Sequence, residues 1–458
     1  MAHRWIGLIL SIPLLLWTLS ALLHPTMRLV RPDIEKTMIA PEPLRLSSNM
    51  LVLKDVLAQQ GINGFNQVRL VAFEGKSFYR VNVEGFPVRY YNTASGALLP
   101  EGDKRYAIYL AQQYLGRSGT AVKKTDYLTE FTDGYGRINR YLPVWSIHFD
   151  RDDQLILTIE TERGRLASKV DNTQGILQAS FAFMHTWNFL ETGNIARITI
   201  FATLMVLSIL MALLGLRLAL KYPAHKQSHW LKRYHRKIGY SVLVAFIMFT
   251  FSGLWQVLQK QTPDNRHLVI KQDHFTVDDL NIGLLKAMRQ VNDPIVAVNL
   301  VMINGDVYFR FELISHHIKY VSAQNGTELE QGERQYARQL ATSMAGLSNA
   351  PIDQLGYEQV THYGPEYRFI DRRLPVAKVT FGNEENERYY VETSTGRLAA
   401  IVTDSSQTAT MIFNLLHKWR WLDWAGKNTR DSIMVLFIIG IVFLIISGFI
   451  KYLKRRQI

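Results

Sequence analysis

The chain has 458 residues, of which 48% are hydrophobic and 20% are charged, so it is long enough for several domains but too polar to lie wholly within lipid. Its 52 lysine and arginine residues exceed its 39 acidic residues and give a net charge of +13. Cysteine is absent, which suits domains outside the cytoplasm that avoid stray disulfides.

The apolar residues are concentrated in four stretches of about 20 residues, the length at which a helix crosses a bilayer. These predicted transmembrane helices comprise residues 5–23, 195–216, 238–258 and 432–450. Each stretch is almost free of charge, and Arg197 near the start of the second can extend its guanidinium to the membrane surface. Together they predict a four-helix transmembrane bundle.

The first stretch has a short basic start and resembles a secretory signal peptide. We expect it to be retained, because the matching stretch at 238–258 is internal and cannot be cleaved off. The two stretches also share a late serine followed by a small residue, in Ser20-Ala21 and in Ser252-Gly253.

Basic residues cluster at two places that flank the predicted helices. The loop at 217–237 has seven of them and no acidic residue, and the tail at 451–458 has four. Together with Arg4 they nearly account for the net charge, so the excess indicates membrane topology and not a nucleic-acid surface. Because short basic loops stay in the cytoplasm, we predict a membrane protein with both termini cytoplasmic, contacts with membrane lipid, and no nucleic-acid partner.

The segments at 24–193 and 259–431 then lie on the periplasmic side, and each has the pattern of a small α+β domain. In the first segment the predicted elements are a helix, three strands and an amphipathic helix, at 51–59, 68–73, 77–83, 88–91 and 104–115. The second segment repeats this order at 284–291, 297–303, 307–313, 318–321 and 334–344.

Single residues also match between the two segments. Tyr90 corresponds to Tyr320 at an offset of 230, and Leu142-Pro143 corresponds to Leu374-Pro375 at an offset of 232. We therefore predict a membrane α+β protein made of two tandem repeats. The chain has no Gly-rich phosphate loop, nucleophile elbow or His-Glu-x-x-His zinc motif.

Four histidines recur at the offset of 232, each at the edge of a predicted helix: His3 with His235, and His185 with His417. A helix of about 20 residues separates its ends by roughly 30 Å, so His3 and His185 cannot share a metal. Pairing across the repeat instead places His3 beside His235 at the cytoplasmic edge, and His185 beside His417 at the periplasmic edge. Two neutral imidazoles that converge in an apolar bundle can be the axial ligands of a haem, which predicts two haem b groups.

The neighbours of these histidines are duplicated as well. Trp187 and Trp419 are expected to flank the periplasmic pair, and Arg4 and Arg236 to meet haem propionates at the cytoplasmic surface. A different interpretation stays open, since histidine and tryptophan at membrane edges are also common interfacial anchors. His24 has no histidine counterpart and is an alternative ligand.

The opening His-Arg-Trp-Ile-Gly-Leu-Ile-Leu, the paired α+β segments and a histidine before each even-numbered helix resemble the PepSY-associated transmembrane family over essentially the whole chain. The resemblance implies a PepSY-like fold, a helix packed on an antiparallel sheet, for both periplasmic segments. Members include di-haem inner-membrane reductases of ferric siderophores from bacteria. By position, the histidines of this chain that match theirs are His3, His185, His235 and His417. The chain departs from the family in the polar, Trp-rich links after His185 and His417.

The leading hypothesis is an electron-transfer enzyme that reduces a ferric siderophore, or another ferric complex, at the periplasmic face. No flavin or nicotinamide module is recognisable, so we expect quinol or a cytoplasmic flavoprotein to donate electrons. The alternative is a non-enzymatic PepSY protein that binds or restrains a periplasmic partner such as a peptidase, which an apolar patch exposed on one sheet would favour. A transporter is disfavoured, because the four predicted helices contain no acidic residue.

Overall fold

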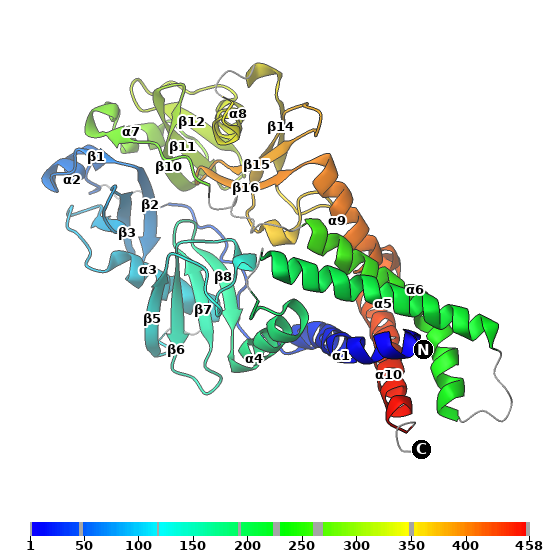
Figure 1. Ribbon diagram of the computed structural model, residues 1–458. Helices are drawn as coiled ribbons and strands as arrows, with labels where there is room; N and C mark the ends of the chain where they lie inside the picture. The colour runs from blue at the N-terminus through cyan, green and yellow to red at the C-terminus, as the bar shows by residue number, and fades with distance from the viewer. Residues whose placement is uncertain are drawn as a thin grey trace. The chain divides into compact units, whose positions relative to one another are not determined.

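The structure, a computed structural model, describes residues 2–44, 49–116, 119–190, 194–222, 230–259, 269–347 and 352–454. The chain divides into two compact units (Figure 1). The helical unit comprises Met1–Arg31, Asn172–Asp264 and Asp404–Ile458, and the β-rich unit comprises Pro32–Asp171 and Asn265–Thr403. Each unit therefore draws on both halves of the sequence.

Four long helices frame the helical unit: α1 (Ala2–Leu29), α5 (Ile195–Lys221), α6 (Trp230–Gln259) and α10 (Lys427–Lys454). All four are long and apolar enough to cross a membrane, which confirms the four predicted spans and a membrane α+β protein. Each extends beyond its predicted range.

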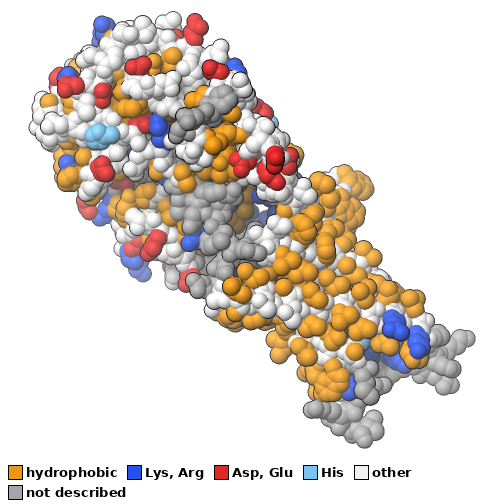
Figure 2. Space-filling model, turned by 45° about the horizontal axis from the view of Figure 1, so that its top comes forward, with side chains coloured by type: hydrophobic (Ala, Val, Ile, Leu, Met, Phe, Trp, Pro, Cys, Tyr) orange, Lys and Arg blue, Asp and Glu red, His pale blue; other side chains and the backbone are white. Residues whose placement is uncertain are grey.

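The long helices pack side by side around a small apolar centre. Helices α1 and α6 each contact both α5 and α10. Leu10 and Leu14 of α1 pack there with Val242 and Phe246 of α6 and with Ile441 of α10. In Figure 2, hydrophobic side chains cover the visible surface of these helices, and Lys and Arg side chains gather at the end that carries both chain ends in Figure 1. This apolar exterior is the surface that a helix bundle presents to lipid.

Two shorter helical segments complete the helical unit. Helix α4 (Asn172–Phe181) continues into the π-helical turn η2 (Ala182–Thr186), and both pack on α1. Helix α9 (Asp404–Leu416) packs on α6 and leads to the 3₁₀ segment η7 (Arg420–Ala425). These segments position His185 and His417.

A six-stranded antiparallel sheet joins the two halves of the sequence in the β-rich unit. Its strand order is β12 (Ile318–Ser322), β11 (Asp306–Leu313), β10 (Ile295–Ile303), β2 (Gln67–Phe73), β3 (Lys76–Asn82) and β4 (Arg89–Asn92). At its centre Asn299 of β10 lies opposite Arg69 of β2, and these two residues correspond at the offset of 230. The periplasmic segments predicted at 24–193 and 259–431 thus share one sheet.

The helices of the β-rich unit lie where the sequence predicts them. They are α2 (Leu53–Gln59), α3 (Gly102–Leu115), α7 (Leu284–Arg289) and α8 (Gly332–Ala345). The short strands β1 (Gly64–Phe65) and β9 (Phe275–Thr276) pair with each other. The 3₁₀ turns are η1 (Arg137–Asn139), η4 (Val277–Asp279), η5 (Ile352–Gln354) and η6 (Phe369–Asp371).

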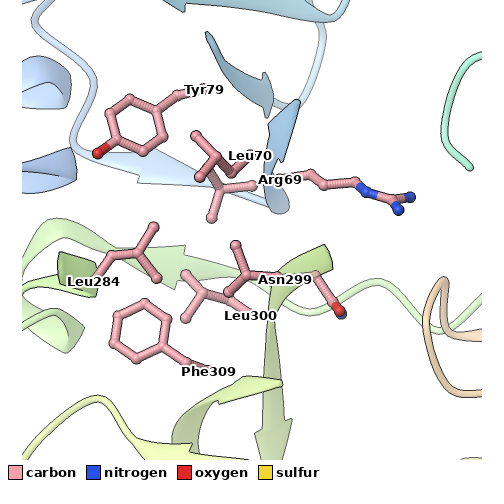
Figure 3. A pocket seen from close by; sticks show the side chains of 9 residues that line it. Arg69, Leu70, Tyr79, Leu284, Asn299, Leu300 and Phe309 are labelled. Atoms are coloured by element: carbon pink, nitrogen blue, oxygen red, sulfur yellow. The ribbon is translucent and has the colours of Figure 1, made fainter. Parts of the chain in front are cut away.

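Both faces of the six-stranded sheet carry packed apolar side chains, and one of them also carries polar residues at its centre. Leu70, Tyr79 and Leu300 pack on the face that α2 and α7 cover. Arg69 and Asn299 point to the other face (Figure 3), as alternate residues of a strand do. The gap that these residues line measures only about 10 Å³, and a polar gap nearby measures about 30 Å³. Neither holds more than about one water molecule.

Two four-stranded antiparallel sheets complete the β-rich unit. Helix α3 packs on the first, which consists of β5 (Val122–Leu128), β6 (Val144–Phe149), β7 (Ile156–Glu160) and β8 (Arg165–Val170). Helix α8 packs on the second, which consists of β13 (Gly356–Val360), β14 (Val376–Thr380), β15 (Arg388–Glu392) and β16 (Arg397–Val402). Each half therefore contributes a helix packed on an antiparallel sheet.

Buried ion pairs connect the two halves of the β-rich unit. Glu162 lies 3.0 Å from Arg397, and Glu392 pairs with both Arg165 and Arg373, the latter at 2.7 Å. Burial alone would raise the pKa of Glu392, but Arg165 and Arg373 hold it well below its ordinary value. The carboxylates are therefore ionised at neutral pH and link the two halves electrostatically.

Candidate functional site

The rings of His185 and His417 meet in the helical unit, with their centroids 6.4 Å apart and their planes at 73°. His185 lies in η2, and His417 directly follows α9. Each ring stacks on the phenylalanine four residues earlier, Phe181 or Phe413, at 4.7 Å in both cases. Two histidines 232 residues apart in the sequence thus converge with matching aromatic neighbours.

A buried serine fixes the proton on each of these rings. The Nδ1 atom of His185 lies 2.9 Å from Oγ of Ser20, and Nδ1 of His417 lies 3.0 Å from Oγ of Ser252. Each serine hydroxyl donates its single proton to the backbone carbonyl three residues earlier, at 2.8 and 2.9 Å. With the hydroxyl donating to this carbonyl, the serine oxygen accepts from Nδ1–H of the imidazole, which leaves the lone pair on Nε2 in the neutral ring.

Burial lowers the pKa of His185 to about 4, with a further contribution from His24. Burial also lowers the pKa of His417 to about 4, helped by His185 and Lys418. Both imidazoles are therefore neutral at neutral pH. A neutral ring with a bonded Nδ1–H and a free Nε2 is the form in which histidine binds a metal.

His3 and His235 have the same tautomer. The Nδ1 atom of His3 lies 2.9 Å from the carbonyl oxygen of Met211, which can only accept a hydrogen bond. The Nδ1 atom of His235 lies 2.7 Å from Oγ of Ser447, whose hydroxyl donates to the carbonyl of Leu444 at 3.1 Å. In the neutral form of both rings, this arrangement places the lone pair on Nε2.

The two histidine pairs lie at different levels of the bundle. Seventeen residues of α1 separate His3 from Ser20, and seventeen of α6 separate His235 from Ser252, which corresponds to about 26 Å along each helix. His3 and His235 are near enough to interact electrostatically. The structure thus groups the four histidines as His185 with His417 and His3 with His235.

The two tryptophans that follow the first pair adopt matching conformations. Trp187 and Trp419 have positive φ values of 48° and 47°, and each indole N–H donates to the backbone carbonyl three residues earlier at 3.1 Å. Trp187 stacks on Trp17 at 5.7 Å, and Trp419 stacks on Phe249 at 5.3 Å. Phe249 in turn contacts the ring of His417 at 5.7 Å. Trp419 therefore reaches the histidine pair through one intervening ring.

A family model described as the PepSY-associated TM region matches residues 1–455. The chain belongs to the PepSY-associated transmembrane family. No curated protein matches the chain. All four histidines of this PepSY-associated chain lie within the matched region, and so do the serines that bond to them.

Two arginines predicted to meet haem propionates contact aromatic rings. The guanidinium of Arg4 lies 5.4 Å from the ring centroid of Trp5 and 5.6 Å from that of Tyr452. Arg236 donates to the backbone carbonyl of Tyr222 and lies 5.6 Å from the ring centroid of Tyr240. Their contact with a cofactor stays a prediction.

The remaining histidines form no further cluster among the residues that the structure describes. His24 lies on α1 and meets Phe181 edge-on at 6.3 Å, so one ring separates it from His185, and it stays an alternative ligand. Within the described ranges, no group of three or more His, Cys, Asp or Glu side chains could hold a metal ion. His225, His229 and His267 lie outside the described residues.

The serines are functional candidates that the sequence alone did not identify. The duplicated Ser20-Ala21 and Ser252-Gly253 pairs indicated only that the first span is retained. A signal was nevertheless present, because the spacing from serine to histidine is 165 residues in both halves. Ser447 had no such signal, since its counterpart at the offset of 232 is Gly215.

Proposed function

We propose that this PepSY-associated chain is a haem-binding electron-transfer protein of the bacterial inner membrane that reduces a ferric complex at the periplasmic face. One observation carries the proposal: among the described residues, all four duplicated histidines have Nδ1 in a hydrogen bond, and they form two pairs within an apolar bundle. Haem bound by two neutral imidazoles supplies a reversible one-electron change at its iron.

The donor set of each pair fits haem better than a bare metal ion. A zinc site takes about four protein or water ligands, whereas each pair here offers two imidazole nitrogens. Two imidazoles fill both axial positions of a haem, whose macrocycle provides the other donors. Phe181 and Phe413 stack on His185 and His417, and apolar surroundings of this kind tune a haem potential.

The proposed topology assigns one pair to each membrane face. The two halves are tandem repeats, with His3 and His235 at the cytoplasmic edge beside the basic loop at 217–237. His185 and His417 lie at the periplasmic edge, the β-rich unit is periplasmic, and both termini are cytoplasmic. Two haem b sites about 26 Å apart along the helices would then carry electrons across most of the bilayer.

The partners follow from the chemistry. Quinol or a cytoplasmic flavoprotein supplies the electrons, since no flavin or nicotinamide module is recognisable in the sequence. One electron delivered at the periplasmic face converts Fe(III) of a ferric siderophore to Fe(II). The oxygen ligands of siderophores hold the softer Fe(II) less tightly, so reduction releases the iron.

An apolar patch exposed across one sheet would favour the alternative function, a partner-binding PepSY protein without redox activity. Among the described residues of the β-rich unit, the most exposed large apolar side chains are Met38, Phe369 and Ile138, at 79%, 68% and 66%. All three lie in bends or 3₁₀ turns and not across one sheet. Single exposed apolar residues of this kind are ordinary on protein surfaces.

Reconstituted vesicles test the proposal directly. The full chain is incorporated with a quinol in the membrane, and a ferric complex with an Fe(II)-specific chelator is added on the side of the β-rich unit. We expect Fe(II) to form with wild type and with His317→Ala, an exposed histidine of the β-rich unit, and not with the double variant of His185→Ala and His417→Ala. Equal rates in all three preparations would exclude the proposed function.

A further inference from the structure

We infer that Ser20, Ser252 and Ser447 are positioning residues that hold histidine rings ready to bind haem iron through Nε2. This inference rests on the proposed function and assigns a role to residues outside the ligand set. The three serines are buried, at 0%, 0% and 1% exposure. Their Oγ atoms lie 2.9, 3.0 and 2.7 Å from Nδ1 of His185, His417 and His235.

Each serine makes two bonds that together allow only one arrangement of the ring. When its hydroxyl donates to the carbonyl three residues earlier, its oxygen accepts from Nδ1–H of the imidazole. That acceptor holds the proton on Nδ1 and orients the ring. Ligating histidines generally need such a partner, because it fixes the tautomer and raises the basicity of the metal-binding nitrogen.

His3 obtains the same restraint without a serine. The carbonyl of Met211 accepts its Nδ1–H, and Gly215 stands at the position that corresponds to Ser447. A Cβ atom built on Gly215 would lie 2.9 Å from Cε1 of His3, so the glycine makes room for the ring at this point. The two halves therefore reach one tautomer by different acceptors, which indicates that the tautomer itself matters.

Serines inside membrane helices commonly bond to their own backbone, and Ser208 shows that simpler arrangement. Its hydroxyl donates to the carbonyl of Leu204 at 2.7 Å, and it is fully buried in α5. No hydrogen bond to a histidine is found for Ser208 among the described residues. Ser208 is thus a matched control with the same burial and a backbone bond of its own, to the carbonyl four residues earlier.

The test measures haem affinity and midpoint potential in the full-length protein. Ser20→Ala, Ser252→Ala, Ser447→Ala and the control Ser208→Ala are purified without haem and titrated with haem b, and the loaded proteins are then titrated with a redox mediator. Serine to alanine removes one oxygen and adds no bulk, so folding is expected to survive. Loss of an outer-shell partner typically lowers metal affinity by about 10- to 100-fold.

We expect Ser20→Ala and Ser252→Ala to weaken one haem site and raise its midpoint potential, because a less basic imidazole stabilises Fe(III) less. Ser447→Ala should alter the other site, and Ser208→Ala neither. Haem binding with the affinity and potentials of wild type in all four variants would overturn this inference alone. A wild-type protein that binds no haem would overturn the proposed function and this inference together.

Discussion

His185 and His417 face each other with their ring centroids 6.4 Å apart, although each is anchored to a different helix of the bundle. His185 bonds to Ser20 of α1, and His417 bonds to Ser252 of α6. Helices α1 and α6 each pack against both α5 and α10. The two rings are therefore anchored to helices on opposite sides of the bundle. A group bound between them would be ligated from both halves of the chain.

Replacing one ring of this pair should remove one haem and spare the other. We expect His185→Ala to lower the haem content from about two per chain to about one, because His3 and His235 lie about 26 Å away along the helices. Haem per chain is measured by the pyridine haemochromogen spectrum. His317→Ala serves as the control. Loss of both haems, or of neither, would contradict the pairing of His185 with His417.

The close approach of His3 to Gly215 predicts that a substitution at Gly215 affects haem binding by His3 and His235 alone. In Gly215→Ala the new Cβ would lie 2.9 Å from Cε1 of His3, so the ring must shift. We expect a loss of about 10-fold or more in haem affinity at the His3 and His235 site, with the other site unchanged. Gly7→Ala is the control, since its Cβ would make an ordinary 3.6 Å contact with Met211. Identical titrations for both variants would show that His3 does not hold haem.

The β-rich unit should lose stability as pH falls towards 2. Burial alone would raise the pKa of Glu312, but Arg163, 2.7 Å away, and Arg310 lower it to about 2. A carboxyl of ordinary pKa in the unfolded chain binds its proton near pH 4, so between about 4 and about 2 the unfolded state binds more protons. Stability is therefore fully present above about pH 4 and is lost below it, by about 3 kcal/mol for this group.

Thermal unfolding of the full chain at several pH values checks this expectation. Glu312→Gln should flatten part of the pH dependence, while Glu101→Gln should leave it unchanged, because the Glu101 side chain is 69% exposed and pairs only with Lys104 at the surface. A Glu312→Gln protein that keeps the wild-type slope between pH 2 and 4 would refute the assignment.

The carboxylate of Glu392 should be essential to the ion pairs that connect the two halves of the β-rich unit. Glu392 is fully buried and pairs with Arg165 and Arg373. In Glu392→Ala the buried Arg373 and the partly exposed Arg165 lose their carboxylate partner, so we expect a loss of about 3 to 5 kcal/mol in the free energy of unfolding. Glu101→Ala should change it by less than about 0.5 kcal/mol. Denaturant titration measures both, and equal midpoints would mean that the buried pair contributes nothing.

Much of the fold could be predicted because its signals are local. Stretches of about 20 apolar residues identify membrane helices without knowledge of their neighbours. The alternation of Val68 to Phe73 and the amphipathic pattern of Lys104 to Leu115 likewise locate a strand and a helix within one or two residues of β2 and α3. Such patterns depend only on which side of an element is buried.

The sheet that both halves of the chain share could not be predicted from these patterns. Asn299 lies opposite Arg69 across the centre of a shared sheet, and strand pairing between segments more than 200 residues apart leaves no mark on either strand alone. Periodicity describes each strand and not its partner. Two similar α+β segments therefore predicted two small domains, where the structure has one sheet that runs through both.

The histidine site was likewise predictable only in part. Duplication at the offset of 232 identified His3, His185, His235 and His417 as a set from the sequence alone. Their acceptors were harder to find, since a backbone carbonyl such as that of Met211 has no sequence signature. Ser20 and Ser252 left a trace in their equal spacing to the histidines, which becomes meaningful only once the contacts are known.

The most direct test of the central claim is the absorption spectrum of the detergent-purified full chain, expressed with haem available and recorded oxidised and after dithionite. The account predicts a Soret band that shifts on reduction, with about two bis-histidine haems per chain. A colourless protein, folded and embedded in detergent as four helices, would contradict it and leave the histidines as interfacial anchors.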